Sequence, residues 1–542
     1  MKLGVSVGAA VTALVLAACS PAEAPPEASV QPEQGAPTDS SALALSETSA
    51  SEIAEAIVAG ETTSEALVEI YLNRIDEIDR AGPRLQSVLS INPSAMEDAR
   101  ALDAELAETG PRGPLHGVPV LLKDNIETAD PLATTAGAMA LKDNVTGRDA
   151  PLAAGLRASG AVILGKTNLS EWANFRSTSS ISGWSALGGQ VRNPHILDRS
   201  PCGSSSGSGA AMAASLAAAA VGTETNGSII CPSAMNGVVG FKPTVGLVDQ
   251  ARIIPISSTQ DTAGPMTKTV RDAAIMLTAM AIGEGATDFA AALSEDALSG
   301  KTIGVLRFAE GENEAISARF AAALEELEAG GATLVEIDEF ETPDGFWSDA
   351  FTVLKVEFKA TLNAYLAEAA ERVTTRSLAD VIAYNSAVGG SELALFDQDI
   401  LEMSEAESGI DDADFLAARA RVLSATRENG IDTLLAEYDV DFLVAPSEEP
   451  AFLVDAVSGD PSGAGVGAGW MAAIAGYPHL TVPMGAVRSL PVGLSFIGAK
   501  GDDAAILAAG YAYEARTNAR VTPAFLASAE AVPVIADAMK RP

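Results

Sequence analysis

The chain has 542 residues, 48% of them hydrophobic, and its 72 acidic and 34 basic side chains give a formal net charge of −38. This length allows one large domain or several ordinary ones, and the composition is typical of a folded α/β protein rather than a fibrous or disordered one. The negative charge argues against nucleic acid as a partner, because phosphate binding depends on clustered Lys and Arg.

The first eighteen residues have the pattern of an export signal. Lys2 precedes an apolar run that ends in Leu16-Ala17-Ala18-Cys19, which resembles the lipobox of bacterial lipoproteins. That resemblance implies cleavage before Cys19 and lipid attachment to it. We therefore expect an exported protein, anchored on the periplasmic side of a bacterial membrane, with the outer membrane favoured. An ordinary secretory signal with an incidental cysteine is the alternative.

Residues 19–45 are rich in Pro, Ala, Ser and Glu and lack apolar periodicity. Such a segment cannot bury enough surface to fold, so it predicts a flexible tether behind the lipidated cysteine. No internal repeat and no second linker follows. We therefore expect residues 46–542 to form one catalytic domain, acting as a monomer.

The pattern beyond the tether predicts an α/β fold. Thr62-x-x-Glu65 has the form of a capping box and predicts the start of a helix. Helical segments such as 267–282 and 353–371 alternate with short β-branched apolar runs that predict buried strands. These runs are 118–122, 161–165, 302–306, 333–337, 442–446 and 492–497. The alternation predicts a single large α/β/α layered domain.

Lys123 is the first candidate for chemistry. It follows the run at 118–122, so we expect it where a buried strand ends, a common position for functional groups in α/β folds. Burial disfavours the ammonium form and lowers the pKa of a lysine, which leaves a neutral amine able to act as a base. Taken alone, a surface or salt-bridge lysine is the commoner role.

Two loops rich in serine and glycine supply the partners. SPCGSSSGSG at 200–209 has too many glycines and serines for a helix interior and predicts a tight loop, and the alanine-rich segment after it predicts a close-packed helix. GTETNGS at 222–228 then offers successive backbone N–H groups that can face a developing oxyanion beside Ser228. Either loop by itself is more typical of a plain turn.

Cysteine and histidine add two further points. Cys202 and Cys231 flank the two loops and can pair in an oxidising compartment if the loops lie side by side, whereas two separate buried thiols are the alternative. His116, His195 and His479 are scattered and give no ligand cluster. We expect neither a metal nor another cofactor.

Longer motifs resemble the amidase signature family. The span 203–244, GSSSGSG through GFKPT, is similar to the family signature. Further agreement comes from LHGVPVLLKDN (115–125), GKTNLSEWANF (165–175), DTAGPM (261–266), AGYPHLTVPMG (475–485) and LPVGLSFIG (490–498). Together these segments extend over most of residues 50–520. The resemblance implies an amide hydrolase built on a mixed central sheet.

On the residues that match these motifs, the resemblance implies a Ser–Ser–Lys triad. Ser228 would be the nucleophile, Lys123 the base, and Ser204 the bridging serine behind a cis peptide bond. The triad would cleave a carboxamide C–N bond through an acyl-enzyme and release ammonia. The oxyanion hole would be formed by the backbone N–H groups of Thr225, Asn226, Gly227 and Ser228. The site would be supported by the neighbouring residues Gly203, Ser205 and Asn125.

Asn226 departs from the glycine that is commoner at its position in the family. It can adopt a left-handed conformation if the loop requires one, at some cost. The geometry of the oxyanion loop is therefore an open point.

Two other interpretations compete for the same residues. Residues 203–207 match G-x-S-x-G, which would make Ser205 the nucleophile of an α/β-hydrolase, but that motif needs a preceding strand and RNPHILDRSPC does not read as one. The second competing interpretation is a non-catalytic, lipid-anchored binding protein built on the same scaffold. An amidotransferase subunit, the tRNA-directed branch of the family, is disfavoured by the export signal and the acidity.

The substrate follows from resemblance within the family. SPCGSSSGS, TETNGSIICPSAMNGVVGFKPTVGLV and EFKATLNAYL are similar to bacterial peptide amidases, which implies a C-terminal peptide amide as substrate. A general aliphatic or aryl amidase is the alternative. Four aromatic residues are hypothesised to lie near the pocket, with core packing as the commoner role for each: Trp172, Phe175, Trp470 and Tyr477.

Overall fold

The computed structural model describes residues 47–283, 285–461 and 465–540. The predicted signal peptide at 1–18, the predicted lipidation site Cys19 and the whole tether to residue 45 lie outside the described residues, so these three assignments stay predictions. The described residues belong to one unit built around a large sheet.

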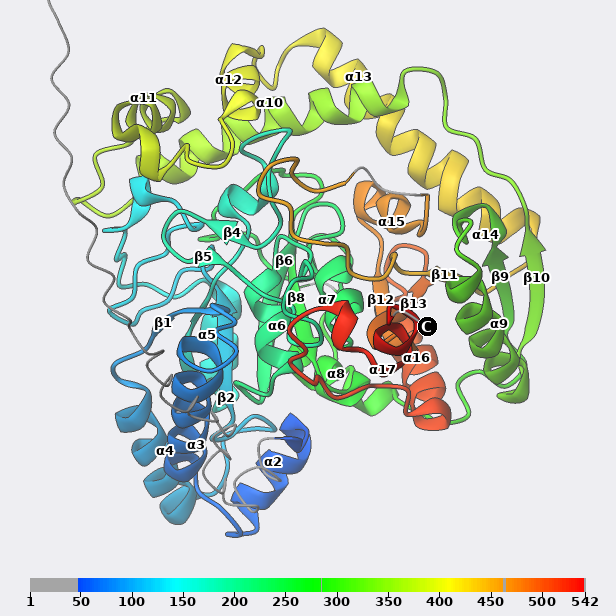
Figure 1. Ribbon diagram of the computed structural model, residues 1–542, viewed down its shortest axis with the longest axis horizontal. Helices are drawn as coiled ribbons and strands as arrows, with labels where there is room; N and C mark the ends of the chain where they lie inside the picture. Colours follow the sequence, from blue (N-terminus) through cyan, green and yellow to red (C-terminus); the bar gives the residue numbers. More distant parts are fainter. Residues whose placement is uncertain (1–46, 284, 462–464, 541–542) are drawn as a thin grey trace, which may run out of the picture. The chain divides into compact units, whose positions relative to one another are not determined.

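Eleven strands form a mixed sheet in the order β1-β3-β2-β6-β8-β7-β12-β13-β11-β9-β10 (Figure 1). Their bounds are β1 Val88–Ile91, β2 Pro119–Lys123, β3 Val162–Thr167, β6 Ala219–Glu224, β7 Val239–Lys242, β8 Thr262–Thr267, β9 Thr302–Leu306, β10 Thr333–Ile337, β11 Phe442–Pro446, β12 His479–Val487 and β13 Leu490–Ile497. Strands β3, β2 and β6 are parallel, as are β11, β9 and β10, and the other neighbours are antiparallel. A further two-stranded sheet pairs β4 (Trp184–Ser185) with β5 (Gly189–Gln190).

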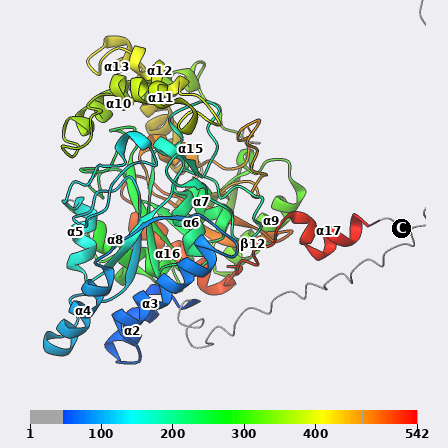
Figure 2. The same cartoon turned by 60° about the vertical axis from the view of Figure 1, so that its left-hand side comes forward.

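All six strands predicted from apolar runs are present, which confirms the α/β fold with a mixed sheet. Every residue of β2 and β6 is buried, as expected for parallel strands covered on both faces. Figure 2 shows α5 and α8 on one side of these strands and α6 and α7 on the other. The predicted layers are therefore observed.

Sixteen α-helices surround the sheet in the described part of the chain. Their bounds are α2 Ala50–Val58, α3 Ser64–Arg74, α4 Ala95–Thr109, α5 Pro151–Ala158, α6 Ser206–Ala213, α7 Ile230–Asn236, α8 Val270–Met280, α9 Glu314–Ala329, α10 Phe346–Ala367, α11 Leu378–Val388, α12 Asp399–Ala406, α13 Ala413–Thr426, α14 Asp432–Glu437, α15 Gly469–Ala475, α16 Asp503–Thr517 and α17 Pro533–Ala538. Within the described ranges, none of these helices combines the length and apolar character that a membrane crossing requires.

The predicted capping box was wrong by one residue. The helix starts after Thr63, whose side chain accepts a hydrogen bond from the backbone of Ala66, so Thr62 lies outside it. A true capping box occurs earlier, where Ser49 and Glu52 exchange side-chain and backbone hydrogen bonds at the start of α2. The sequence signal was ambiguous because two threonines stand in succession and either can cap a helix.

Helices α10 to α13 lie together along the upper edge of the view in Figure 1. Apolar side chains of α10 and α11, among them Phe358 and Val381, pack against Trp172 and Ile254 from the loops above the sheet. Glu357 of α10 accepts a hydrogen bond from the hydroxyl of Ser257. These helices therefore support the loops that border the central strands.

Close packing between β8 and β7 makes a side chain at Gly264 impossible without movement. A Cβ there would stand 2.0 Å from the backbone oxygen of Phe241. We expect Gly264→Ala to lower the free energy of unfolding by about 1–3 kcal/mol, as overpacked cores do. Urea unfolding followed by circular dichroism measures this. Gly409→Ala, where a Cβ meets no atom of the described residues within 4 Å, is the matched control, and equal stability of the two variants would contradict the prediction.

Candidate active site

Lys123 is the last residue of β2, in the middle of the parallel part of the sheet. The strands on either side are β3 and β6, and Lys123 lies opposite Thr167 in the register. The preceding residues of β2 are fully buried, so the lysine is carried into the interior and its own exposed fraction is 0%. Its predicted position at the end of a buried strand is confirmed.

The amine of Lys123 contacts hydroxyl and carbonyl oxygens. Its Nζ donates to Ser204 Oγ at 2.8 Å, to Thr223 Oγ1 at 2.8 Å and to the Thr223 carbonyl at 3.2 Å. Burial lowers the pKa of Lys123 from 10.5 to about 7, against the opposing attraction of the Asp261 and Glu224 carboxylates. A large fraction of this amine is therefore uncharged near neutral pH.

Ser204 is held in a buried loop beside that amine. The peptide bond between Gly203 and Ser204 is cis, as the family resemblance implies. The backbone of Ser170 donates to the Ser204 carbonyl at 3.1 Å, and a Cβ on Gly203 would come within 2.2 Å of Ser170 Oγ. Glycine is required there because the two loop segments approach so closely.

Ser205 ties this loop to β6. Its Oγ donates to the Thr223 carbonyl at 3.0 Å and accepts from the Thr223 backbone at 3.2 Å. Asn125 supports the same threonine, because its Nδ2 donates to Thr223 Oγ1 at 2.9 Å. Two of the three predicted supporting residues, Ser205 and Asn125, thus contact Thr223, which sequence reasoning missed.

The prediction of a loop over 200–209 followed by an alanine-rich helix was wrong in its boundaries. Helix α6 already begins at Ser206 and contains the two glycines of SGSG, which let it pack against the backbone of neighbouring segments. The later alanines belong to a turn and to β6. Small residues suit a tightly covered helix and a tightly covered strand equally well, so composition did not separate them.

The loop at 225–228 presents unused backbone donors. Within the residues that the structure describes, no hydrogen-bond acceptor meets the N–H of Thr225, Asn226, Gly227 or Ser228. Gly227 has a φ of 83°, whereas Asn226 has no positive φ and its side chain is exposed. The residue with the left-handed conformation in this loop is therefore Gly227. Asparagine at position 226, where glycine is commoner in the family, imposes no backbone strain.

Ser228 lies next to the lysine–serine cluster with 8% of its surface exposed. Its carbonyl accepts a hydrogen bond from the backbone of Ser205 at 3.1 Å, so the two serine loops are side by side. In the described part of the chain its Oγ makes no hydrogen bond with Ser204 Oγ. The structure thus joins Lys123 to Ser204 directly and brings Ser228 alongside.

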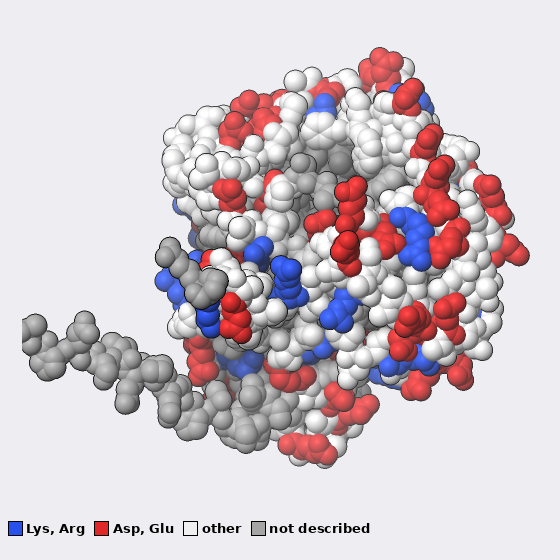
Figure 3. Space-filling model, turned by 45° about the vertical axis from the view of Figure 1, so that its right-hand side comes forward, with Lys and Arg blue, Asp and Glu red and all other residues white. Residues whose placement is uncertain are grey.

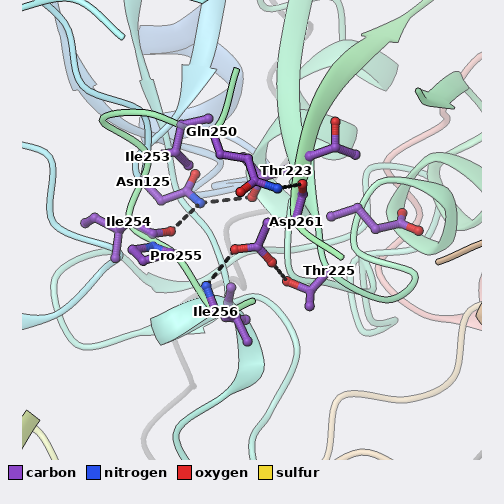
Figure 4. Close-up of a pocket in the computed structure, with 12 residues that line it drawn as sticks. Asn125, Thr223, Thr225, Gln250, Ile253, Ile254, Pro255, Ile256 and Asp261 are labelled. Carbon is purple, nitrogen blue, oxygen red and sulfur yellow. Dashed lines mark hydrogen bonds between the residues drawn. The ribbon is translucent and has the colours of Figure 1, made fainter. Parts of the chain in front are cut away.

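Two carboxylates shape the loop, Glu224 buried and Asp261 half-buried, and neither was predicted. Glu224 accepts from the backbones of Ile229 and Ile230, at 2.7 and 3.0 Å. Asp261 accepts from Thr225 Oγ1 at 2.6 Å, and Figure 4 shows its carboxylate between Thr225 and Ile256. Burial raises the pKa of Asp261 to about 6. Both residues lie inside motifs that the sequence analysis identified, TETNGS and DTAGPM. The periodicity of apolar residues does not indicate which acidic side chains are buried, so their roles were not predicted.

Two cavities border these residues. One of about 20 Å³ lies on the lysine side and is lined by Asn125, Thr223 and Asp261, among others (Figure 4). The other, of about 250 Å³, is lined by Asn226 and Gly227 of the 225–228 loop and by residues far away in sequence. The loop therefore borders the larger cavity at Asn226 and Gly227 and the smaller one at Thr225.

Cys202 and Cys231 form a disulfide with a Cα–Cα separation of 5.9 Å. The pairing that the sequence left open is therefore present, and it links the segment before Gly203 to the first turn of α7. Both cysteines line the larger cavity. Across the described ranges, no three His, Cys, Asp or Glu side chains are grouped so that they could hold a metal ion.

The four aromatic residues proposed for the pocket have different positions. Trp172 and Phe175 belong to the core beneath α10 and α11. Tyr477 is buried and donates its hydroxyl to Asp432 at 3.0 Å. Only Trp470 of the four lines the larger cavity.

Comparison with known proteins identifies the class of enzyme as an amide hydrolase. The family model named Amidase matches residues 66–507, a range that includes Lys123, Ser204 and Ser228. The chain belongs to the amidase family.

Relatives in this family are similar over nearly the whole chain. A protein described as "Probable amidase" from Arabidopsis thaliana is 37% identical over 512 residues, covering 90% of this chain and 93% of its own. A glutamyl-tRNA(Gln) amidotransferase subunit from Exiguobacterium sibiricum is 34% identical, covering 84% of this chain and 95% of its own. Native peptide amidase from Stenotrophomonas maltophilia superposes with a TM-score of 0.83 at 45% identity, covering 88% of this chain and 99% of its own.

The buried amine of Lys123 has a consequence for stability that depends on pH. In the unfolded chain the lysine has its ordinary pKa of 10.5, and in the folded chain about 7. Its effect is therefore destabilising, greatest and constant below pH 7, and lost as the pH rises to about 10.5. We expect the stability of wild type relative to Lys123→Met to rise between these two pH values. Urea unfolding of both proteins at a series of pH values measures the difference, and a difference that does not change with pH would contradict the low pKa.

Proposed function

We propose that the protein hydrolyses the C-terminal amide of peptides through a triad of Lys123, Ser204 and Ser228. The observation that carries this proposal is the buried Lys123 amine, whose pKa is lowered to about 7 and which lies 2.8 Å from Ser204 Oγ. A neutral lysine has two N–H donors and one lone pair. The three donated hydrogen bonds described above belong to the ammonium form. In the neutral form both N–H groups are directed to the Thr223 oxygens, the bond to Ser204 reverses, and the lone pair takes the proton of Ser204.

The reaction starts when Ser228 Oγ attacks the amide carbon. Its proton passes to Ser204 as the proton of Ser204 passes to Lys123, so charge does not accumulate on either serine. The C–N bond then breaks, and the relay returns a proton to the departing nitrogen, which leaves as ammonia. Water attacks the resulting acyl-enzyme by the same route and releases a carboxylate. General acid–base transfer of this kind contributes about 10²–10⁴-fold.

The loop at 225–228 would stabilise the tetrahedral intermediate. Its N–H groups have no acceptor in the described part of the chain, so no internal hydrogen bond has to break when the oxyanion forms. Preorganised donors of this kind contribute about 10²–10³-fold each. Glu224, Asp261 and the disulfide hold the two ends of the loop, which keeps the donors in place.

The similarity to solved peptide amidases supports peptide amides as the substrate class. One of them, at 46% identity and a TM-score of 0.84, was solved in complex with the competitive inhibitor chymostatin. The amidotransferase relatives are 31–35% identical. A general aliphatic or aryl amidase is the competing assignment within the family.

Release of ammonia from alanyl-phenylalaninamide tests the proposal, with butyramide as the comparison. We expect higher kcat/KM for the dipeptide amide, and equal or lower turnover of it would contradict the peptide-amide assignment. Ser228→Ala should reduce activity to background and Lys123→Met by about 10²–10⁴-fold. Ser205→Ala is the matched serine control and should retain more activity, because its hydroxyl only joins the loop to β6. Complete loss of activity in Ser205→Ala, together with retained activity in Ser228→Ala, would favour an α/β-hydrolase instead.

We also propose that the protein is exported and lipid-anchored through Cys19. The Cys202–Cys231 disulfide supports an oxidising compartment, since disulfides persist there and are rare in the cytosol. Cys19→Ala should move the protein from the membrane fraction to the soluble periplasmic fraction. Mass spectrometry of the wild type should show loss of residues 1–18 and addition of acyl chains. A cleaved but unacylated terminus would favour an ordinary secretory signal, and an intact Met1 would exclude both.

A further inference from the structure

The cavity of about 250 Å³ has no part in the hydrolytic relay, yet it adjoins it. Gly203, Asn226 and Gly227 line it together with Ser447, Glu448 and Trp470. A substrate whose carbonyl oxygen reached the N–H groups of the 225–228 loop would therefore extend into this cavity. The lining residues would contact the part of the substrate next to the reacting carbonyl.

Glu448 is the one ionisable side chain that lines this cavity in the described structure. It is partly buried, and no hydrogen bond or ion pair within the described ranges involves its carboxylate. Burial, followed by the neighbouring carboxylates of Glu224 and Glu449, raises its pKa to about 8. With that pKa the unpaired Glu448 side chain is mostly protonated at pH 7, and a positive group bound beside it would favour its carboxylate form.

Trp470 favours the same kind of ligand. It belongs to α15, and its ring contacts Phe346 and Trp347 at centroid distances of 5.5 and 5.0 Å and Phe340 at 6.1 Å. These contacts hold the indole in place at the cavity wall. Indole attracts cations through its ring electrons, so both the carboxylate and the aromatic residue prefer a positive group.

The segment that carries Glu448 is rigidly attached. Ser447 donates its backbone N–H to Gly493 at 2.8 Å, and its hydroxyl contacts those of Thr481 at 2.7 Å and Ser495 at 2.9 Å. Ser495 in turn contacts His479 Nε2 at 2.7 Å. The residue before Glu448 is thus fixed, which limits the entropy that the carboxylate would lose on binding.

The surrounding charges are also negative. Among the described residues that line the cavity there is no Lys or Arg, and Ser182 on its wall donates its backbone N–H to Asp460 at 2.9 Å. Acidic side chains are spread over the face shown in Figure 3, in keeping with the net charge of −38. Such a field raises the local concentration of cations.

We propose that Glu448 and Trp470 form a cation subsite that selects amides whose acyl part carries an ammonium group, such as the free amino terminus of a short peptide amide. This inference rests on the proposed function and adds the charge of the preferred substrate to it.

Alanyl-phenylalaninamide and its N-acetyl derivative differ in this charge and in the acetyl group that removes it. We expect the wild type to hydrolyse the free-amine form with a kcat/KM at least about tenfold higher at pH 7, as for a charge-assisted hydrogen bond shielded from water. Glu448→Gln should remove this preference and leave hydrolysis of the acetylated substrate within about twofold. Glu449→Gln, the neighbouring carboxylate outside the cavity lining, is the matched control and should keep the preference.

Three results would overturn the inference: no preference in the wild type, a preference that survives Glu448→Gln, or an equal loss on both substrates in that variant. Calorimetric titration of the Ser228→Ala protein with the same two compounds separates this inference from the proposed function. Binding does not require turnover, so tighter binding of the free-amine compound supports the subsite even if no ammonia is released. Equal binding of the two compounds contradicts it, and this comparison needs no substitution at Glu448.

Discussion

The site depends on a lysine amine that is buried without a carboxylate beside it. Lys123 Nζ contacts the Ser204 hydroxyl and the two Thr223 oxygens, whereas Asp261 and Glu224 act on it only through longer-range attraction. An ion pair with either acid would favour the ammonium form and raise the pKa. Backbone donors prevent this, because Ile256 and Ser257 bind Asp261 while Ile229 and Ile230 bind Glu224. Both acids are thus engaged by backbone donors at 229–230 and 256–257 and not by the lysine.

This arrangement explains why small residues fill the middle of the sheet. β2 delivers Lys123, β6 delivers Thr223 and the oxyanion loop, and the two residues that lead into α6, Ser204 and Ser205, lie against both strands. Gly222 in β6 leaves room for Ser205, whose Oγ would lie 2.8 Å from a Cβ there. Larger side chains would separate the two serine loops, so the alanine and glycine content of this region is a requirement of the site and not only of the core.

Sequence reasoning reached the parts of this structure that depend on local pattern. The apolar runs predicted the strands because burial on two faces leaves a direct trace in composition, and Lys123 stood out because it interrupts such a run. The start of α6 and the roles of Thr223, Glu224 and Asp261 were missed. These depend on hydrogen bonds between segments far apart along the chain, as when Thr225 meets Asp261, and neither periodicity nor propensity records such contacts. Asn226 shows the same limit, since only the backbone angles reveal that Gly227 takes the left-handed position.

The distribution of charge also bears on the direction of the reaction. Hydrolysis converts a neutral amide into a carboxylate, which would bind most firmly where a cation faces it. Among the described residues, no Lys or Arg lines either of the two cavities at the site, and burial lowers the pKa of the Lys123 amine to about 7, so about half of it is uncharged at that pH. A carboxylate product therefore meets no Lys or Arg on the described walls of either cavity with which it could form an ion pair.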